Sequence, residues 1–196
     1  MDYYLDQIQE RFYKLEWNRT YDFLEFLLSC DNYDQRRNNL IWQLNQVFDE
    51  EKLPYKIIDG YVTPLISEEE VVEVEAALNT KYALVSNHLR KALEYYKKRP
   101  TADYKNSIKE SISAIEALAK IILNNQSGTL GNLVDGLNIH QSLKEAIKKI
   151  YGWTSDEGGI RHSEKEGQGV IDGSEARYML IHCSALVNFI ISKYED

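Results

Sequence analysis

The sequence predicts a mainly α-helical protein, and three observations lead to that prediction. The 196 residues include only three prolines and ten glycines, so long stretches contain no residue that would break a helix. Apolar residues recur at spacings of three and four through most of the chain, which is the period of an amphipathic helix. The period changes clearly around Asp59-Gly60, where a single small β-hairpin is expected.

The length allows one full domain or two small ones, and the pattern favours a division into three parts. We expect an N-terminal helical region at 1–53, a hairpin at 54–66 that joins two helical parts, and a helical bundle at 67–196. The first region carries stripes rich in aromatic rings, which predict helix–helix packing or a surface that faces a partner. A lone hairpin is marginal in water, so this one must lie on helices or pair elsewhere.

Polar residues at the ends of the apolar stripes predict where helices begin and end. Asn18 is expected to cap the second helix, and Ser67 with Glu70 forms a capping box for the first helix of the bundle. Pro100 ends a helix that contains His88, a histidine among apolar residues that we interpret as a satisfied core side chain. Ser174 is expected to cap the last helix, whose apolar face fills a core or a dimer interface.

Charge and cysteine content exclude several classes of function. The net charge of −8 argues against a nonspecific grip on nucleic acid or anionic membrane, although it leaves room for a local basic cleft. No apolar run approaches the length of a membrane span, and the N-terminus lacks the basic start of a signal peptide. Cys30 and Cys183 are far apart on apolar helix faces, which predicts buried thiols in a reducing cytoplasm.

The candidate site lies in the polar stretch Gly152–Glu164, between two patterned helices. Gly158 and Gly159 let the backbone bend sharply just before Arg161 and His162. An always-charged guanidinium can hold a phosphate while an imidazole moves a proton, so the pair suits chemistry on a phosphodiester. The alternative is that both side chains pair with the acidic residues of the same loop, such as Asp156, and merely fix it.

The helix expected from Asp103 to about Asn124 carries further candidates. Ser111 lies inside its apolar arc, where it serves either a site or its own helical turn. Glu116 lies at the edge of the arc, where it either reaches the Arg-His loop or pairs with Lys120 one turn on. The four histidines are scattered and neither cysteine has a neighbour at ligand spacing, so neither a metal nor another cofactor is expected.

Three strings carry a resemblance to a known family: Val62–Glu70, Asp103–Ala117 and Tyr151–His162. They resemble the AbiJ-type abortive-infection N-terminal domain, which is related to the HEPN superfamily. The resemblance covers roughly residues 50–195 and is weaker in the first 50. It implies a HEPN-like antiparallel helical bundle, commonly dimeric, in bacterial antiphage or toxin-type systems.

Many HEPN proteins are metal-independent ribonucleases in which an Arg and a His, four to six residues apart, meet across a dimer interface. Here Arg161 and His162 are adjacent instead. Arg177 and His182 fit the spacing, but on one helix their side chains point about 140° apart, so they could converge only through a second subunit. We regard the loop pair as the better candidate.

Two functions follow from the resemblance and the residues. In the first, an endoribonuclease of antiphage defence, Arg161 clamps the phosphate, His162 is the general acid/base, and Glu116 or Asp156 orients the imidazole. Lys105, Ser111, Gly158 and Gly159 would contact the substrate. In the second, the chain is a non-catalytic dimerisation, nucleotide-binding or sensing module of a defence or toxin–antitoxin system. The expected partners are a second copy, RNA or a nucleotide, and a partner protein of the defence system, but not a membrane.

Overall fold

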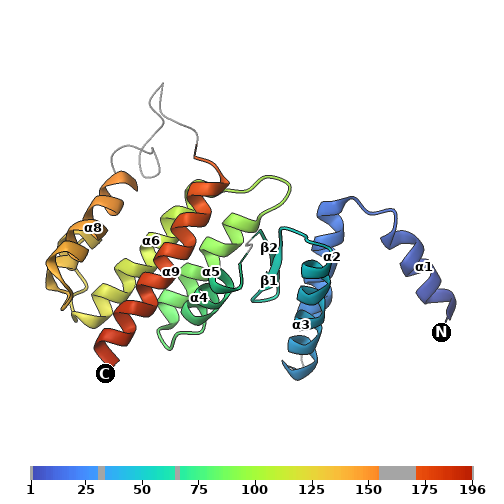
Figure 1. Cartoon of the computed structure of the whole chain (residues 1–196), viewed down its shortest axis with the longest axis horizontal. Helices are drawn as coiled ribbons and strands as arrows, with labels where there is room; N and C mark the ends of the chain where they lie inside the picture. Colours follow the sequence, from blue (N-terminus) through green and yellow to red (C-terminus); the bar gives the residue numbers. More distant parts are fainter. Residues whose placement is uncertain (1, 31–33, 65–66, 155–170, 196) are drawn as a thin grey trace. The chain divides into compact units, whose positions relative to one another are not determined.

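The computed structural model describes residues 2–30, 34–64, 67–154 and 171–195, and within them the predicted mainly α-helical fold class is confirmed (Figure 1). The chain forms two compact units. The first contains residues 1–66 together with 99–101, and the second contains 67–98 and 102–196.

The first unit consists of three helices followed by the predicted hairpin. Its elements are α1 (Asp2–Phe12), α2 (Trp17–Cys30), α3 (Asp34–Glu50), β1 (Lys56–Ile58) and β2 (Tyr61–Thr63). The strands pair antiparallel, with Ile57 opposite Val62. Asp59 and Gly60 turn the chain with φ values of 52° and 85°, the left-handed conformation that a tight two-residue hairpin requires.

Side chains from two helices satisfy the backbone of the hairpin. Asn45 of α3 accepts a hydrogen bond from the N–H of Ile57 at 2.7 Å and donates to its carbonyl at 3.3 Å. Glu25 of α2 accepts from the N–H of Val62 on the other strand at 2.9 Å. A two-stranded sheet leaves both of its outer edges without strand partners, so these contacts fix the hairpin on the helices, as expected for a hairpin that cannot stand alone.

The core of the first unit is small. Its fully enclosed cluster consists of Leu28, Phe48, Ile57 and Val62, with partly buried side chains such as Tyr21 around it. The cluster joins α2, α3 and both strands, and it leaves many aromatic side chains of this unit on the surface.

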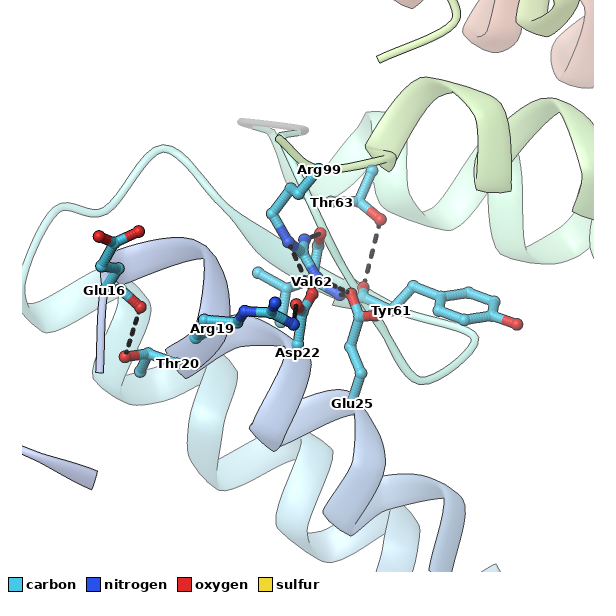
Figure 2. A network of polar contacts seen from close by, with 9 residues as sticks. All are labelled: Glu16, Arg19, Thr20, Asp22, Glu25, Tyr61, Val62, Thr63 and Arg99. Atoms are coloured by element: carbon cyan, nitrogen blue, oxygen red, sulfur yellow. Dashed lines mark hydrogen bonds and ion pairs between the residues drawn. The ribbon is translucent and has the colours of Figure 1, made fainter. Parts of the chain in front are cut away.

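An arginine from the short segment 99–101 completes the first unit (Figure 2). Arg99 donates to Glu25 at 2.7 Å, to Asp22 at 3.1 Å and to the carbonyl of Val62 at 3.1 Å. Its guanidinium also lies 5.7 Å from the ring centre of Tyr21. The side chain of Arg99 is only 8% exposed, so this cation connects α2 and β2 from the inside of the unit.

The second unit is a helical bundle. Its elements are α4 (Glu68–Leu78), α5 (Ala83–Lys97), α6 (Tyr104–Ile122), α7 (Leu130–Leu133), a short 3-10 helix η1 (Val134–Gly136), α8 (Gln141–Gly152) and α9 (Gly173–Glu195). The predicted capping box is confirmed, because the N–H of Glu70 donates to the hydroxyl of Ser67 and the carboxylate of Glu70 accepts from the N–H of Ser67. Asp103 caps α6 by accepting from the N–H of Asn106.

The core of the bundle lies where α5, α6 and α9 run side by side (Figure 1). Apolar side chains from each of these helices are completely enclosed, among them Leu89, Leu118 and Leu180. The buried stripes predicted for α6 and α9 therefore form one continuous interior. Two further contacts hold α9 against α4, from Arg177 to Glu70 and from Asn188 to Glu73.

Three local predictions are wrong. Asn18 lies inside α2 rather than at its cap, because helical hydrogen bonding already begins with the N–H of Thr20 donating to Glu16. Asp172 performs the capping contact predicted for Ser174, since its carboxylate accepts from the N–H of Ser174 at 2.6 Å. Cys30 is exposed rather than buried, while Cys183 is buried as predicted.

Candidate functional site

The Arg-His loop predicted as the catalytic centre lies outside the described residues. This applies to Asp156, Gly158, Gly159, Arg161 and His162, all of which fall between 155 and 170. The described residues on either side of this segment are Thr154, the second residue after α8, and Ile171, the second residue before α9.

Glu116 is held by two contacts within its own part of the bundle. One carboxylate oxygen accepts from the ammonium of Lys120 at 2.8 Å, which is the pairing one turn along the helix. The other oxygen accepts from the N–H of Leu130 at 3.2 Å, at the first residue of α7. Helix N-termini have unsatisfied N–H groups, so Glu116 acts here as a cap for α7.

Ser111 is buried, and its hydroxyl donates to the carbonyl of Ser107 one turn earlier, at 2.9 Å. Ser107 in turn donates to the carbonyl of Ala92 on α5, at 2.8 Å. The two hydroxyls therefore satisfy backbone groups where α5 and α6 pack closely. Lys105, the other substrate-binding candidate on α6, lies half-buried in the first turn of that helix.

Arg177 and His182, the second Arg-His match, have separate environments on α9. The guanidinium of Arg177 donates from Nη2 to both carboxylate oxygens of Glu70, each at 2.6 Å. The ring of His182 instead stacks on that of Tyr178, with centroids 5.5 Å apart and planes inclined by 24°. Burial lowers the pKa of His182 below its ordinary value of 6.5, so the ring is neutral at neutral pH.

The same end of α9 lines an open hollow against α8. The hollow has a volume of about 350 Å³, and Lys149, Ile150, Trp153, Glu175 and Tyr178 line it. Its walls are largely hydrocarbon and aromatic, since Trp153 and Ile150 come from the end of α8 and Tyr178 from the second turn of α9. Tyr178 is 54% exposed, so a large part of its surface remains accessible to a ligand.

Two opposite charges complete this aromatic pocket. Lys149 brings an exposed ammonium, and Glu175 brings a carboxylate that also accepts from the N–H of Asp172 at 2.8 Å. A flat ring can stack on tyrosine or tryptophan, while an ammonium attracts an anionic group and a carboxylate accepts from N–H or O–H donors. The surface that lines the hollow is almost wholly apolar, so it suits the flat face of a ring, and Lys149 and Glu175 are the charged residues among its lining.

The described part of the chain offers no cluster of three His, Cys, Asp or Glu side chains that could hold a metal ion. None of its helices is both long and apolar enough to cross a lipid bilayer.

A comparison with family models identifies the N-terminal part. Residues 1–80 match the model of AbiJ N-terminal domain 4. These 80 residues are similar to an AbiJ-type N-terminal domain. This confirms the family predicted from the sequence, and an AbiJ domain indicates a role related to abortive infection. No curated protein and no solved structure matches the chain.

The extent predicted for the resemblance needs correction. The AbiJ match covers the first 80 residues, including the 50 that were expected to resemble the family more weakly, and ends just after α4. Of the three strings quoted for the resemblance, Val62–Glu70 falls inside the match. Asp103–Ala117 and Tyr151–His162 fall outside it. The family signal therefore lies in the helices and hairpin of the first unit and in α4.

Sequence reasoning did not single out the aromatic pocket. Trp153 belongs to the polar stretch Gly152–Glu164, in which the charged residues carry the predicted chemistry, and Tyr178 lies between Arg177 and His182 of the second Arg-His match. The available signal was two aromatic residues, Trp153 directly after α8 and Tyr178 in the second turn of α9. Aromatic rings that lie beside opposite charges at neighbouring helix ends are typical of ligand pockets.

Proposed function

We propose that the chain acts in abortive infection as a nucleotide-binding sensor, which works in the cytoplasm and takes its ligand into the aromatic pocket of the second unit. The proposal rests on one hollow of about 350 Å³. Two aromatic residues, Trp153 and Tyr178, and two charged residues, Lys149 and Glu175, line it together. That volume lies in the range of small-molecule sites. The base would stack on the aromatic rings, Lys149 would attract the phosphate, and Glu175 would accept from the base or the ribose.

The contacts of the other candidates support binding over catalysis. Glu116, proposed to orient an imidazole, already bonds Lys120 and the N–H of Leu130. Arg177 is engaged by Glu70 through both carboxylate oxygens, which holds α9 against α4. The side chains of Glu116 and Arg177 are thus engaged in structural contacts. Lys149 and Tyr178, in contrast, line an open hollow.

Calorimetric titration of the purified chain with AMP, GMP, CMP and UMP tests this function. We expect one of them to bind, and we expect Tyr178→Ala and Trp153→Ala each to weaken binding by about tenfold or more, in line with the loss of one stacking contact. Trp42→Ala is the matched control, because Trp42 is 62% exposed and lies on α3 of the first unit. Absence of binding by the parent chain, or equal binding by all variants, would refute the sensor.

The sequence favours a second candidate, a HEPN-like metal-independent endoribonuclease. Its support is the pair Arg161-His162 directly after a glycine hinge, with Asp156 nearby in the chain and with Lys105, Ser111, Gly158 and Gly159 as proposed substrate contacts. The test is cleavage of RNA in EDTA by the parent chain, Arg161→Ala and His162→Ala. Cleavage by the parent and loss in both variants would establish this activity, while equal cleavage by all three, or none, would exclude it.

A further inference from the structure

His88 forms a close pair with Glu110 between two helices of the second unit. His88 lies on α5 and Glu110 on α6, and Nδ1 of the imidazole is 2.7 Å from Oε2 of the carboxylate. Their side chains are 25% and 18% exposed. His88 therefore has the hydrogen-bond partner that the sequence predicts for it, but it lies at the surface of the bundle rather than in its core.

The carboxylate determines which ring nitrogen of His88 carries the proton. An ionised carboxylate only accepts hydrogen bonds, so Nδ1 must donate to Glu110. In the neutral ring the lone pair then lies on Nε2. Nε2 bonds none of the described residues and is not fully buried, so solvent reaches it. The pair thus presents a nucleophilic nitrogen to solvent, with the imidazole held by a carboxylate as in sites of nucleophilic and acid-base catalysis.

Two lysines add positive charge beside this pair. Lys91 lies one turn after His88 on α5, which places both side chains on the same side of the helix. Lys109 directly precedes Glu110 on α6, and both lysines are exposed. Neither lysine forms an ion pair with a carboxylate of the described residues. Their ammonium groups therefore favour a negatively charged reactant, such as a phosphoryl compound, over a neutral one.

We propose that His88 is a phosphoryl-accepting residue, which takes a phosphoryl group onto Nε2 from a phosphoramidate. This class of donor also includes the phosphorylated imidazole of another protein. The lone pair of Nε2 forms the new N–P bond, and the electron pair of the breaking P–N bond leaves with the amine or imidazole of the donor. The proton stays on Nδ1, where Glu110 balances the positive charge of the phosphorylated ring. Lys91 and Lys109 attract the phosphoryl group of the donor.

This site goes beyond the proposed nucleotide sensor. None of its four residues lines the aromatic pocket, and they lie on α5 and α6 rather than at the ends of α8 and α9. Loss of nucleotide binding would therefore leave the phosphoryl acceptor untouched, and the reverse also holds.

Reaction of the purified full chain with potassium phosphoramidate tests the proposal. Peptide mass spectrometry at alkaline pH measures the rate at each histidine, and ³¹P NMR distinguishes phosphorylation at Nε2 from that at Nδ1. His140 is the control within the same chain, because it is exposed but its Nδ1 accepts from the N–H of Ser142 at 3.2 Å. The neutral ring of His140 therefore carries its proton on Nε2, the opposite tautomer. We expect His88 to react at Nε2, about tenfold faster than His140 or more.

Substitution of the carboxylate tests its part in the reaction. Glu110→Gln keeps the size of the side chain and its ability to accept from Nδ1, but it removes the charge that balances the phosphorylated ring. We expect the rate at His88 to fall by about tenfold or more, in line with other carboxylates that orient a histidine. Glu145→Gln is the control, since Glu145 is exposed on α8 and its loss should leave that rate unchanged.

The comparison of two histidines within the parent chain needs no substitution, so it holds even where a variant fails to fold. No product at His88, or a rate at His88 no higher than at His140, would overturn the proposal. A Glu110→Gln chain with the helical circular dichroism of the parent and an unchanged rate at His88 would overturn it as well.

Discussion

The two units of the chain keep their folds by different means. The second unit encloses apolar side chains from three long helices, so close packing stabilises it in the ordinary way. The first unit has a small apolar cluster and relies on polar side chains, Asn45, Glu25 and Arg99, that bond its hairpin and helices. The first unit is therefore the more sensitive to the loss of a single charge, and the second unit to the loss of a single buried hydrocarbon side chain.

The largest expected effect is that of Arg99→Met on the first unit. Substitution with Met removes the guanidinium that bonds the carboxylate of Glu25, whose side chain is only 12% exposed. Such a loss typically costs about 3–5 kcal/mol. Hydrogen exchange measured by mass spectrometry should show rapid exchange in α2 and the hairpin, with less change in α6 and α9.

Arg19→Met is the control for this substitution. Arg19 pairs with Asp22 on the same helix at 3.8 Å and is 70% exposed, so its loss should leave the exchange pattern unchanged. If Arg99→Met behaved like Arg19→Met, the polar network in Figure 2 would not hold the first unit together, and the contrast between the units would fail.

The second expected effect is that of Leu118→Ala on the second unit. Leu118 is fully enclosed on α6, and a leucine-to-alanine change in such a site costs about 2–5 kcal/mol through lost burial and the cavity that remains. Urea unfolding followed by the fluorescence of Trp153, in a chain without the other two tryptophans, would report the change. Leu84→Ala on α5, where the leucine is 53% exposed, should change the midpoint only slightly.

Much of this architecture follows from the sequence because local rules determine it. The turn at Asp59-Gly60 needs two left-handed residues, and the box of Ser67 and Glu70 satisfies orphan N–H groups within a single turn, so both predictions are confirmed. The family could also be named from its strings, although the match lies further toward the N-terminus than expected.

The rest depends on contacts between residues far apart in the chain. Nothing local shows that Arg99 will bond Glu25, 74 residues away, or that Glu116 will cap α7 rather than face a substrate. The aromatic pocket was missed for the same reason, since Trp153 and Tyr178 are 25 residues apart and line one hollow only in the folded chain. Cys30 was misplaced because apolar residues lie around much of α2, and periodicity does not tell which of them are buried.

A third substitution measures how much one hydrogen bond between α5 and α6 contributes to the stability of the second unit. Ser107→Ala removes the hydroxyl that donates to the carbonyl of Ala92, in a fully buried position. A buried hydrogen bond of this kind contributes about 1 kcal/mol, so the unfolding midpoint should fall modestly. Ser113→Ala is the control, because that hydroxyl bonds only the carbonyl of Lys109 in its own helix and its loss should have a smaller effect.

The smallest expected effect is a dependence of the second unit on pH through His182. Burial against Tyr178 holds the pKa of His182 below 6.5, so between that value and the folded pKa the unfolded chain binds a proton that the folded chain does not. The stability of the second unit should therefore be level above about pH 7 and fall as the pH drops through 6.5, with a slope of less than about 1.4 kcal/mol per pH unit for one proton.

Urea midpoints of the parent and of His182→Gln between pH 7.5 and about pH 5 measure this effect. If His182→Gln shows the same slope as the parent, His182 does not couple the stability of the second unit to pH.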